Sequence, residues 1–376
     1  MDPKSNGGAA GLDIGASVEE TVAKLKEIEQ KREKGVLYIG IDLGTSRTRV
    51  AASNGVRAGC WSYVGYPRDL VARKAVEKDI LFGKEAYDRK TSVDLYRPLE
   101  KGVIKFSDAD DVDEGAAERN MTAVKDLVRH AVTLARPRKE ELLYGVIGCP
   151  AQASIKNKQA IIEAAREVLD SVVICSEPFS VAYGLGVLTD ALVIDIGAGT
   201  TDLCRMKGAM PDESDQITND FAGDFVDAEL EARLQARFKG AQFTRNQIKE
   251  IKERFATIDE VAQPIIWSFP VDGKPRPFDI TEDLRMACRS IVEPMVKAVE
   301  RLVATFDPEL QPRIRNNILL GGGASQIRGL GRAIEQALTE YGGGKVSHVE
   351  EPCYAGANGS LAIAQDMPED TWEQLR

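Results

Sequence analysis

The chain has 376 residues, of which 43% are hydrophobic and 29% charged, and its formal net charge at pH 7 is −10. This length exceeds what one hydrophobic core usually organises and indicates two domains. The sequence contains no block of Lys or Arg, which disfavours direct contact with nucleic acid or with an anionic membrane. No apolar run approaches the roughly 18 residues of a membrane-spanning helix, and the N-terminus lacks a signal-peptide core. We therefore expect a cytoplasmic protein without membrane insertion.

Histidine and cysteine usage narrows the chemistry further. The sequence contains two histidines, His130 and His348, which disfavours a His-based metal site or catalytic triad. The six cysteines are scattered without a C-x-x-C pair, a distribution typical of reduced core thiols.

The first 35 residues read as an extension of the globular chain. Residues 1–15 are rich in Gly, Ala and Ser and are expected to be disordered. Residues 16–34 have helical spacing, with a narrow apolar stripe of Val18, Val22, Leu25 and Ile28 among charged residues. The stripe carries no aromatic anchor, which disfavours a helix lying on a membrane. It fits either a helix packed on the body or a partner, or a solvated tail.

The first apolar strand leads into a turn of small residues. Five of the six residues at 36–41 are apolar, which predicts a strand buried on both faces. The residues that follow include Asp42, Gly44, Thr45 and Ser46. A glycine lets the backbone turn tightly and approach a ligand, and the N–H groups and hydroxyls after it can hold phosphate oxygens. Alone, this motif is weak.

Strands and helices alternate up to the middle of the chain. A strand enters a hairpin turn at 50–55, and the mixed, turn-rich segment 66–111 predicts a small inserted subdomain. The elements expected next are a helix at 121–135, a strand at 142–147, a helix at 157–169, a strand at 172–174 and a helix at 180–186. Glu177 falls in the connection before the last of these helices.

The strand-and-turn motif returns at 191–202. An apolar strand again ends at an Asp, and the residues concerned are Asp195, Gly197, Gly199, Thr200 and Thr201. Two such loops facing each other would clamp a nucleotide triphosphate between related domains.

The second half then repeats the alternation, with Gly223 preceding its first helix. The expected elements are helices at 225–238 and 244–258, a hairpin at 263–279, a long helix at 283–306 bent by Pro294, a strand at 317–320 and a helix at 326–341. Alternating strands and helices in both halves predict an α/β fold.

The two aspartates at the strand ends are the first candidates for chemistry. A lone carboxylate buried at the end of an apolar strand is costly, and a divalent cation removes that cost. Because Mg²⁺ keeps several waters, Asp42 and Asp195 suit a magnesium site in which water molecules bridge to the ion. A turn or capping role remains the alternative for either residue taken singly.

Other candidates are weaker when they are taken alone. Gly322 and Gly323 lie between a buried strand and a helix, where backbone can pass close to a flat ligand or simply make a tight turn. Glu177 could orient or deprotonate a water molecule, or cap a helix. Lys252 and Glu253 flank an apolar helical stripe and could equally form a solvated pair. The sequence contains neither a Walker A motif nor a dinucleotide-binding Gly-x-Gly-x-x-Gly after a strand.

Taken in order, these segments resemble the superfamily of actin, sugar kinases and heat-shock chaperone ATPases. Segments 40–46 and 195–202 resemble its two phosphate motifs, 176–179 its connecting motif, 322–329 its adenosine motif, and 251–254 the actin segment at the adenine and ribose. The resemblance implies two ribonuclease-H-like domains around a cleft that binds ATP or ADP with Mg²⁺. It implies that Glu177 positions the attacking water and that Asp42 and Asp195 hold the metal through water. The nucleotide-binding residues it implies are Gly44, Thr45, Ser46, Gly197, Gly199, Thr200, Thr201, Gly223, Lys252, Glu253, Gly322, Gly323 and Gln326.

Within this superfamily the chain resembles the filament-forming bacterial actins. It is too short for a chaperone's peptide-binding domain, and no catalytic Asp of a sugar kinase is identifiable. Segment 97–104 resembles both cell-shape and magnetosome actins, whereas 64–69, 176–184 and 372–376 are closer to the magnetosome (MamK-type) family. This resemblance implies an ATPase that polymerises with copies of itself, organises and segregates magnetosome organelles, and contacts magnetosome adaptor proteins. The alternatives are a cell-shape scaffold, a plasmid-segregating actin and a small-molecule kinase.

The resemblance also implies domain boundaries. An extension at 1–35 departs from the short N-terminus typical of that family. The expected parts of the body are domain I at 36–182 plus 353–376, with its insertion at 66–111, and domain II at 183–352, with its insertion at 221–280.

Overall fold

A computed structural model of the chain describes residues 35–101, 103–105 and 114–376. The segments 1–15 and 16–34, for which disorder and a helix are predicted, lie outside the described residues. Within the described residues, no helix combines the length and apolar character needed to cross a bilayer.

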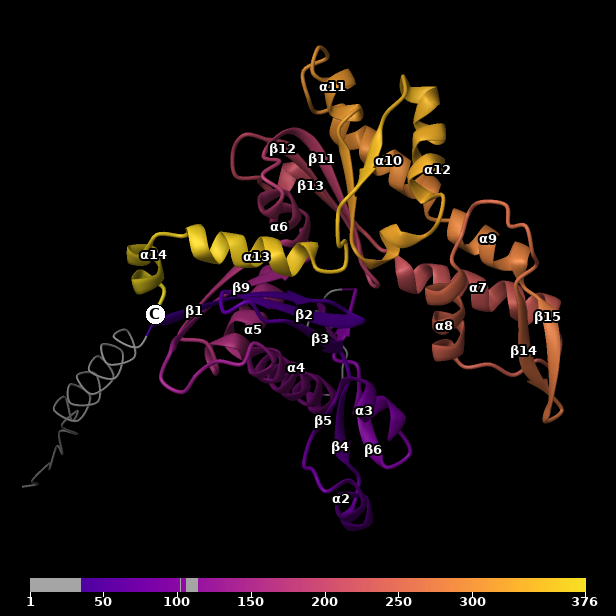
Figure 1. Cartoon of the computed structure of the whole chain (residues 1–376), viewed down its shortest axis with the longest axis horizontal. Coiled ribbons are helices and arrows are strands. Elements are labelled where there is room, and N and C mark those ends of the chain that lie inside the picture. The colour runs from indigo at the N-terminus through magenta and orange to yellow at the C-terminus, as the bar shows by residue number, and fades with distance from the viewer. Residues whose placement is uncertain (1–34, 102, 106–113) are drawn as a thin grey trace, which may run out of the picture.

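Two five-stranded sheets form the body, and they repeat one plan (Figure 1). In each sheet an antiparallel meander of three consecutive strands is extended by two parallel strands from later in the chain. The first sheet consists of β10 (Ser171–Ser176), β9 (Leu142–Cys149), β1 (Val36–Leu43), β2 (Arg47–Ala52) and β3 (Arg57–Trp61). The second consists of β13 (Gln216–Asn219), β12 (Thr201–Lys207), β11 (Thr189–Ile196), β16 (Ile318–Gly321) and β17 (Val346–His348). The predicted actin-like α/β fold is confirmed.

Helices cover the first sheet on both faces because β1 has apolar residues on both sides. Leu37, Ile39 and Ile41 are buried in one core with residues of α4 (Glu114–Leu134) and α5 (Ile155–Arg166). On the opposite face, α13 (Ala355–Asp366) crosses at Gly40, where a Cβ atom would lie 2.2 Å from the Ala357 carbonyl oxygen. Only glycine allows this approach, so one residue of β1 determines where α13 passes.

Helices α6 (Glu177–Gly184) and α13 lie between the two sheets. Helix α6 packs against α13 and also contacts strands β11 and β12 of the second sheet. The last helix, α14 (Glu369–Gln374), carries the fully buried Trp372, whose ring stacks on Tyr144 of β9 at a centroid distance of 4.9 Å. The C-terminal segment therefore packs on the first sheet. The domain boundaries given above stay a prediction.

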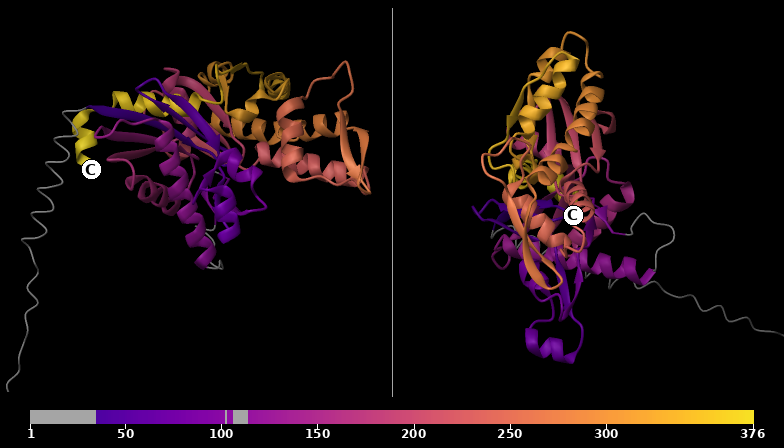
Figure 2. Two further views of the ribbon diagram at one scale, coloured as in Figure 1. Left: turned by 60° about the horizontal axis from the view of Figure 1, so that its bottom comes forward. Right: turned by 90° about the vertical axis from the view of Figure 1, so that its right-hand side faces the viewer.

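Two smaller groups of elements project from the body at separate ends (Figure 2). The first consists of β4 (Val64–Pro67), α2 (Leu70–Val76), β5 (Leu81–Phe82), α3 (Gly83–Asp88) and β6 (Val93–Tyr96), followed by the short pair β7 (Leu99–Glu100) and β8 (Val103–Ile104). The second consists of α7 (Gly223–Arg237), α8 (Arg245–Phe255), β14 (Ile266–Val271), β15 (Lys274–Asp279) and α9 (Thr281–Arg289). The hairpin predicted at 263–279 is present.

Several predicted helices are wrong in extent. The helix predicted at 121–135 begins seven residues earlier, at Glu114 of α4. The long helix at 283–306 is two helices, α9 and α10 (Val292–Val303), which are separated at Ser290 and Ile291. Pro294 lies in the first turn of α10, where its missing N–H costs nothing, and its ring would clash with the residue 290 carbonyl of a continuous helix.

The helix predicted at 326–341 begins later, at Leu330 of α12 (Leu330–Leu338). Gly329 precedes it with a φ of 83°, a left-handed conformation that interrupts a helix. The remaining elements are α11 (Gln311–Arg315) and three 3-10 turns at Glu213–Asp215, Gly323–Gln326 and Thr339–Tyr341.

Candidate active site

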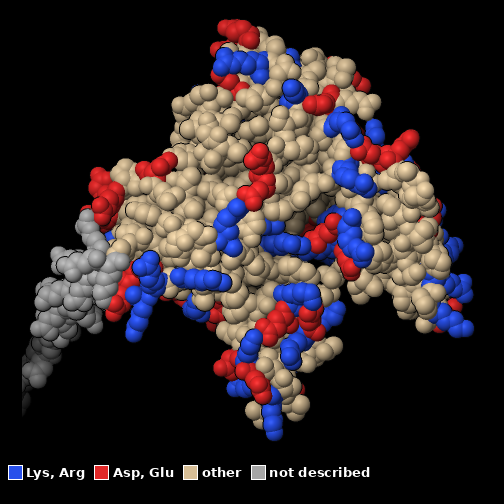
Figure 3. Space-filling view, viewed as in Figure 1, with Lys and Arg blue, Asp and Glu red and all other residues tan. Residues whose placement is uncertain are grey.

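A cavity of about 480 Å³ lies at the carboxyl ends of β1 and β11, and both sheets contribute to its wall. Charged side chains of both signs gather around its mouth, in the middle of the face shown in Figure 3. Ligands commonly bind where loops follow the carboxyl ends of parallel strands. We call residues 42–46 loop 1 and residues 195–200 loop 2.

The two loops face each other in contact. A Cβ atom on Gly199 would lie 2.5 Å from the Thr45 hydroxyl oxygen and 2.7 Å from the Cα of Lys101. In loop 2, the Gly197 N–H donates to the Thr200 carbonyl over 2.9 Å and closes the turn. In loop 1, the Ser62 hydroxyl donates to the Gly44 carbonyl over 2.6 Å. Glycines therefore let two backbone turns approach each other, and their remaining N–H groups and hydroxyls border one cavity.

Asp42 and Asp195 occupy equivalent places in the two sheets. Each is aligned with a glycine of the neighbouring parallel strand, Gly148 for Asp42 and Gly321 for Asp195. Both carboxylates line the cavity together with Glu177. The duplicated strand and turn therefore place an acidic side chain at the same position of each sheet.

Glu177 is the first residue of α6, and β10 ends at the residue before it, Ser176. The predicted connection between strand and helix is therefore absent at this point. The side chain is 8% exposed, and a Cβ atom on Gly148 would lie 3.4 Å from its Cγ. Among the described residues no side chain donates a hydrogen bond to the Glu177 carboxylate, which leaves its oxygens available to water. The N-terminus of α6 favours the negative charge.

The acids at the cavity are short of positive charge. Burial raises the pKa of Asp195 to about 8, and the charges of Asp42 and Asp202 add to this rise. Burial also raises the pKa of Glu177 well above its ordinary value, with Asp202 as the strongest charged neighbour. Arg49 opposes the rise at Asp42 and Asp195. A divalent cation would remove this imbalance.

These acids fit a magnesium ion held through water. Within the described ranges, no group of three or more His, Cys, Asp or Glu side chains is placed to ligate a metal directly. Mg²⁺ keeps several of its waters in protein sites, and carboxylates at that distance accept hydrogen bonds from them. Asp42 and Asp195 therefore stay the predicted metal residues.

Helices α7 and α8 form another part of the wall. The Gly223 N–H donates to the Gly197 carbonyl over 3.1 Å, which fixes the start of α7 to loop 2. Lys252 donates to the Gly223 carbonyl over 2.5 Å and pairs with Asp227 at 2.8 Å. Glu253 pairs with Arg47 of β2 at 2.9 Å, across the mouth of the cavity. Lys252 thus holds the wall in place, and Glu253 joins the two sides.

The far end of the cavity is formed by the turn after β16. Gly322 has a φ of 80°, and a Cβ atom there would lie 2.4 Å from Asp195 Oδ1 and 2.3 Å from the Ile196 carbonyl oxygen. Gln326 donates from Nε2 to the Gly323 carbonyl and to Cys353 Sγ, both over 3.1 Å. The backbone at 322–323 is therefore close to loop 2 and open toward the cavity, as a flat ligand requires.

The structure brings all but one of the predicted site residues to this cavity. The exception is Thr201, the fully buried first residue of β12, whose hydroxyl donates to the Phe221 carbonyl over 2.8 Å. Thr200, which precedes β12, lines the cavity, whereas Thr201 does not. We do not retain Thr201 as a nucleotide ligand.

Several residues of the cavity were missed by the sequence reasoning. Arg47 and Arg49 are two positions apart in β2, directly after loop 1, and both line the cavity. This spacing puts both side chains on one face of the strand and could have predicted their place. Lys249 lies one helical turn before Lys252, donates to the Ser46 hydroxyl, and has a pKa lowered by burial to about 8. Cys353 also lines the cavity, and no sequence signal marks it.

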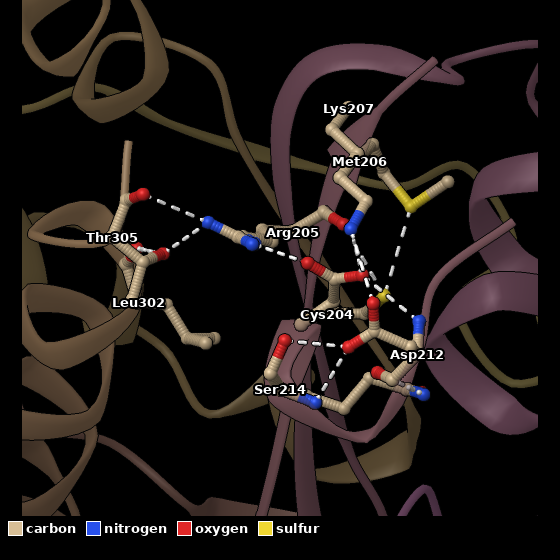
Figure 4. A network of polar contacts seen from close by, with 10 residues as sticks. Cys204, Arg205, Met206, Lys207, Asp212, Ser214, Leu302 and Thr305 are labelled. Carbon is tan, nitrogen blue, oxygen red and sulfur yellow. Dashed lines mark hydrogen bonds and ion pairs between the residues drawn. The ribbon is translucent and has the colours of Figure 1, made fainter. Parts of the chain in front are cut away.

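A separate buried acid, Asp215, lies outside the cavity. Its carboxylate pairs with Arg205 and with Lys207, the latter at 2.7 Å, and accepts the Asp212 N–H over 2.8 Å. Figure 4 shows Arg205 extended from this group toward Thr305, whose carbonyl it reaches at 3.0 Å. Burial alone would raise the pKa of Asp215, but the bonds from Lys207, the Asp212 amide and Arg205 lower it. This acid is fully balanced.

Comparison with known proteins gives consistent results. A sequence model described as MreB/Mbl protein matches residues 37–371. The actin-like protein MamK of Paramagnetospirillum magneticum is 35% identical over 342 residues, covering 91% of this chain and 96% of that protein. A solved MamK double helical filament has a TM-score of 0.83 at 34% identity, covering 88% of this chain and 99% of that one. A non-polymerising MamK mutant bound to AMPPNP has a TM-score of 0.67 at 34% identity over the same shares.

Proposed function

The chain belongs to the MreB/Mbl family of actin-like proteins, and we propose that it binds Mg²⁺ and ATP in this cavity, hydrolyses ATP to ADP and phosphate, and polymerises into filaments. The observation that carries this proposal is the contact between loop 1 and loop 2. Two equivalent turns, each preceded by an aspartate, face one cavity from two sheets. A phosphate chain between them would be held from both sides.

The residues of the cavity suit phosphoryl transfer to water. When bound, Mg²⁺ would supply positive charge to the phosphate oxygens and to the crowded acids. Glu177 orients the attacking water and accepts one of its protons as the water oxygen bonds to the terminal phosphorus. The bond between that phosphorus and the bridging oxygen breaks, and ADP leaves with the electron pair. The turn at Gly322 and Gly323 receives the adenosine, with Gln326 beside it.

Nucleotide binding would draw the two halves of the body together. We retain domain I at 36–182 plus 353–376 and domain II at 183–352 as those halves. ATP contacts both loops, so it favours the closed arrangement over an open one. Closure presents the shape that adds to a filament, and hydrolysis then weakens the contacts between subunits.

We further propose that the filaments lie in the cytoplasm and organise, align and segregate magnetosome organelles, with magnetosome-associated adaptor proteins as additional partners. The support for this role is the 35% identity to MamK over almost the whole length of both proteins. No nucleic acid enters this proposal.

A pelleting assay with negative-stain microscopy tests the proposed function. With Mg²⁺ and ATP we expect filaments and phosphate release, both of which require the nucleotide. Failure to form filaments across salt and nucleotide conditions would overturn the proposal. Phosphate transfer to a small acceptor, without filaments, would assign the cavity to a kinase instead.

A further inference from the structure

We propose that Arg97 is a positioning residue that ties loop 1 to loop 2 and so determines how tightly the cavity holds a phosphate chain. This inference rests on the proposed nucleotide binding. Arg97 follows β6 and is not part of the cavity wall, so it acts through the residues that it holds.

One guanidinium group contacts both sides of the cavity. Arg97 Nε donates to the Thr45 carbonyl oxygen of loop 1 over 3.0 Å. Arg97 Nη2 donates to Asp224 Oδ2 over 2.8 Å. The side chains of Arg97 and Asp224 are only 19% and 21% exposed. Because the pair is largely shielded from water, it is stronger than a surface ion pair.

Asp224 is itself fixed to loop 2. Its backbone N–H donates to the Ala198 carbonyl over 2.6 Å, beside the bond from the Gly223 N–H to the Gly197 carbonyl. A continuous series of contacts thus runs from Thr45 through Arg97 and Asp224 to loop 2. If the guanidinium is removed, loop 1 and loop 2 lose this connection while the cavity wall keeps its residues.

The geometry requires arginine rather than any cation. A planar guanidinium directs two separate N–H groups at two acceptors, whereas the single ammonium of lysine cannot reproduce that fork. Lysine at this position would retain the charge facing Asp224 and lose the fixed contact to loop 1. We therefore expect the nucleotide affinity of Arg97→Lys to lie between those of the wild type and Arg97→Met.

The experiment measures the affinity of ATP, ADP and AMP, each with Mg²⁺, by calorimetry at protein concentrations below assembly. In Arg97→Met we expect ATP and ADP to bind about tenfold more weakly and AMP to change less than twofold, because the loops act on the outer phosphates. In Arg97→Lys we expect about a threefold loss. The double variant Arg97→Met, Asp224→Asn should bind ATP no more weakly than the single variant with the lower affinity, since both changes remove the same connection between the loops.

The matched control is Arg68→Met, which removes an exposed ion pair to Asp94 in the same projecting group. It should leave all three affinities unchanged. Wild-type affinity for ATP in Arg97→Met, or an equal loss for ATP and AMP, overturns the inference, because the first shows no role and the second a general loss of structure. A wild-type chain that binds no ATP at all overturns the proposed function as well. In steady-state hydrolysis, KM should rise in Arg97→Met with kcat changed less than twofold.

Discussion

The buried acids of the cavity and the buried Asp215 are balanced in opposite ways. Asp42, Asp195 and Glu177 have raised pKa values. Arg49 opposes the rise at the two aspartates, whereas Arg47 and Lys252 of the same wall pair with Glu253 and Asp227. Asp215 is fully buried, yet two cationic side chains and a backbone N–H lower its pKa. An acid that is fully paired stabilises the fold, whereas acids left short of charge are poised for a ligand that brings it.

The difference follows from what each site must do. At Asp215, positive charge comes from β12 itself, through Arg205 and Lys207, and it is always present. At the cavity, a bound cation such as Mg²⁺ would have to supply the positive charge that the acids need. The comparison therefore predicts that loss of an acid harms function in one region and stability in the other.

The largest expected effect is that of Glu177→Gln on hydrolysis. The amide keeps the shape of the side chain but cannot accept the proton of the attacking water, so kcat should fall about 10³-fold. ATP binding and filament assembly should persist, because Glu177 is not needed to hold the phosphates. Phosphate release and pelleting measured on the same sample check this. Hydrolysis at the wild-type rate would remove Glu177 from the mechanism.

Asp215→Asn should be the most destabilising of these changes. It leaves Arg205 and Lys207 beside a neutral amide in a buried place, at a cost of about 3 kcal/mol in the free energy of unfolding. Urea unfolding measures the loss. Once corrected for folded protein, ATP hydrolysis should stay at the wild-type rate, and a selective loss of hydrolysis would break the distinction between the two regions.

Gly322→Ala tests whether the close approach of the residue 322 backbone to the Asp195 carboxylate is needed for stability and ATP binding. The new methyl group would meet Asp195 Oδ1 and the Ile196 carbonyl in a left-handed backbone conformation, with an expected cost of about 2 kcal/mol. ATP affinity should fall as well, because loop 2 moves. Gly273→Ala, also at positive φ but with open space around it, controls for the backbone effect alone.

Asp195→Asn should change the free energy of unfolding least, and it should raise it, whereas Asp215→Asn and Gly322→Ala lower it. Without nucleotide or metal, removal of one of the crowded charges should stabilise the chain by about 1 kcal/mol at pH 8. Assembly that depends on Mg²⁺ and ATP should be lost. Thermal unfolding with and without ligand checks both parts. Lower stability of the unliganded variant at pH 8 would contradict the description of this cluster.

The pH dependence of stability sharpens the same contrast. The pKa of Asp195 rises from 3.8 to about 8 on folding, so between these values the folded chain keeps a proton that the unfolded chain has lost. Its contribution to stability therefore falls as the pH rises from about 4 to 8. The lowered pKa of Asp215 acts in the reverse sense, because its contribution is present above pH 3.8 and is lost as the pH falls through the folded pKa. Urea unfolding of the wild type and Asp195→Asn at pH 5 and 8 isolates the first effect.

Local sequence pattern predicted much of the cavity. Apolar strands ending in Asp42 and Asp195, each followed by glycines and hydroxyl residues, were recognisable because a buried strand and a tight turn have strong local signals. The same local logic failed at 283–306, where apolar helical spacing continued across a break. Spacing reports which face is buried and does not report that a proline ring excludes one continuous helix.

The sequence by itself determined the α/β fold and the duplicated strand-and-turn motif with Asp42 and Asp195, since each depends on residues close together in the chain. Only the tertiary structure decided that Thr201 turns away from the cavity, that Asp215 is neutralised, and that Arg97 reaches both loops. Thr45 and Asp224 lie 52 and 127 positions from Arg97. Contacts at such separations arise from the packing of the two sheets, and no local pattern encodes them.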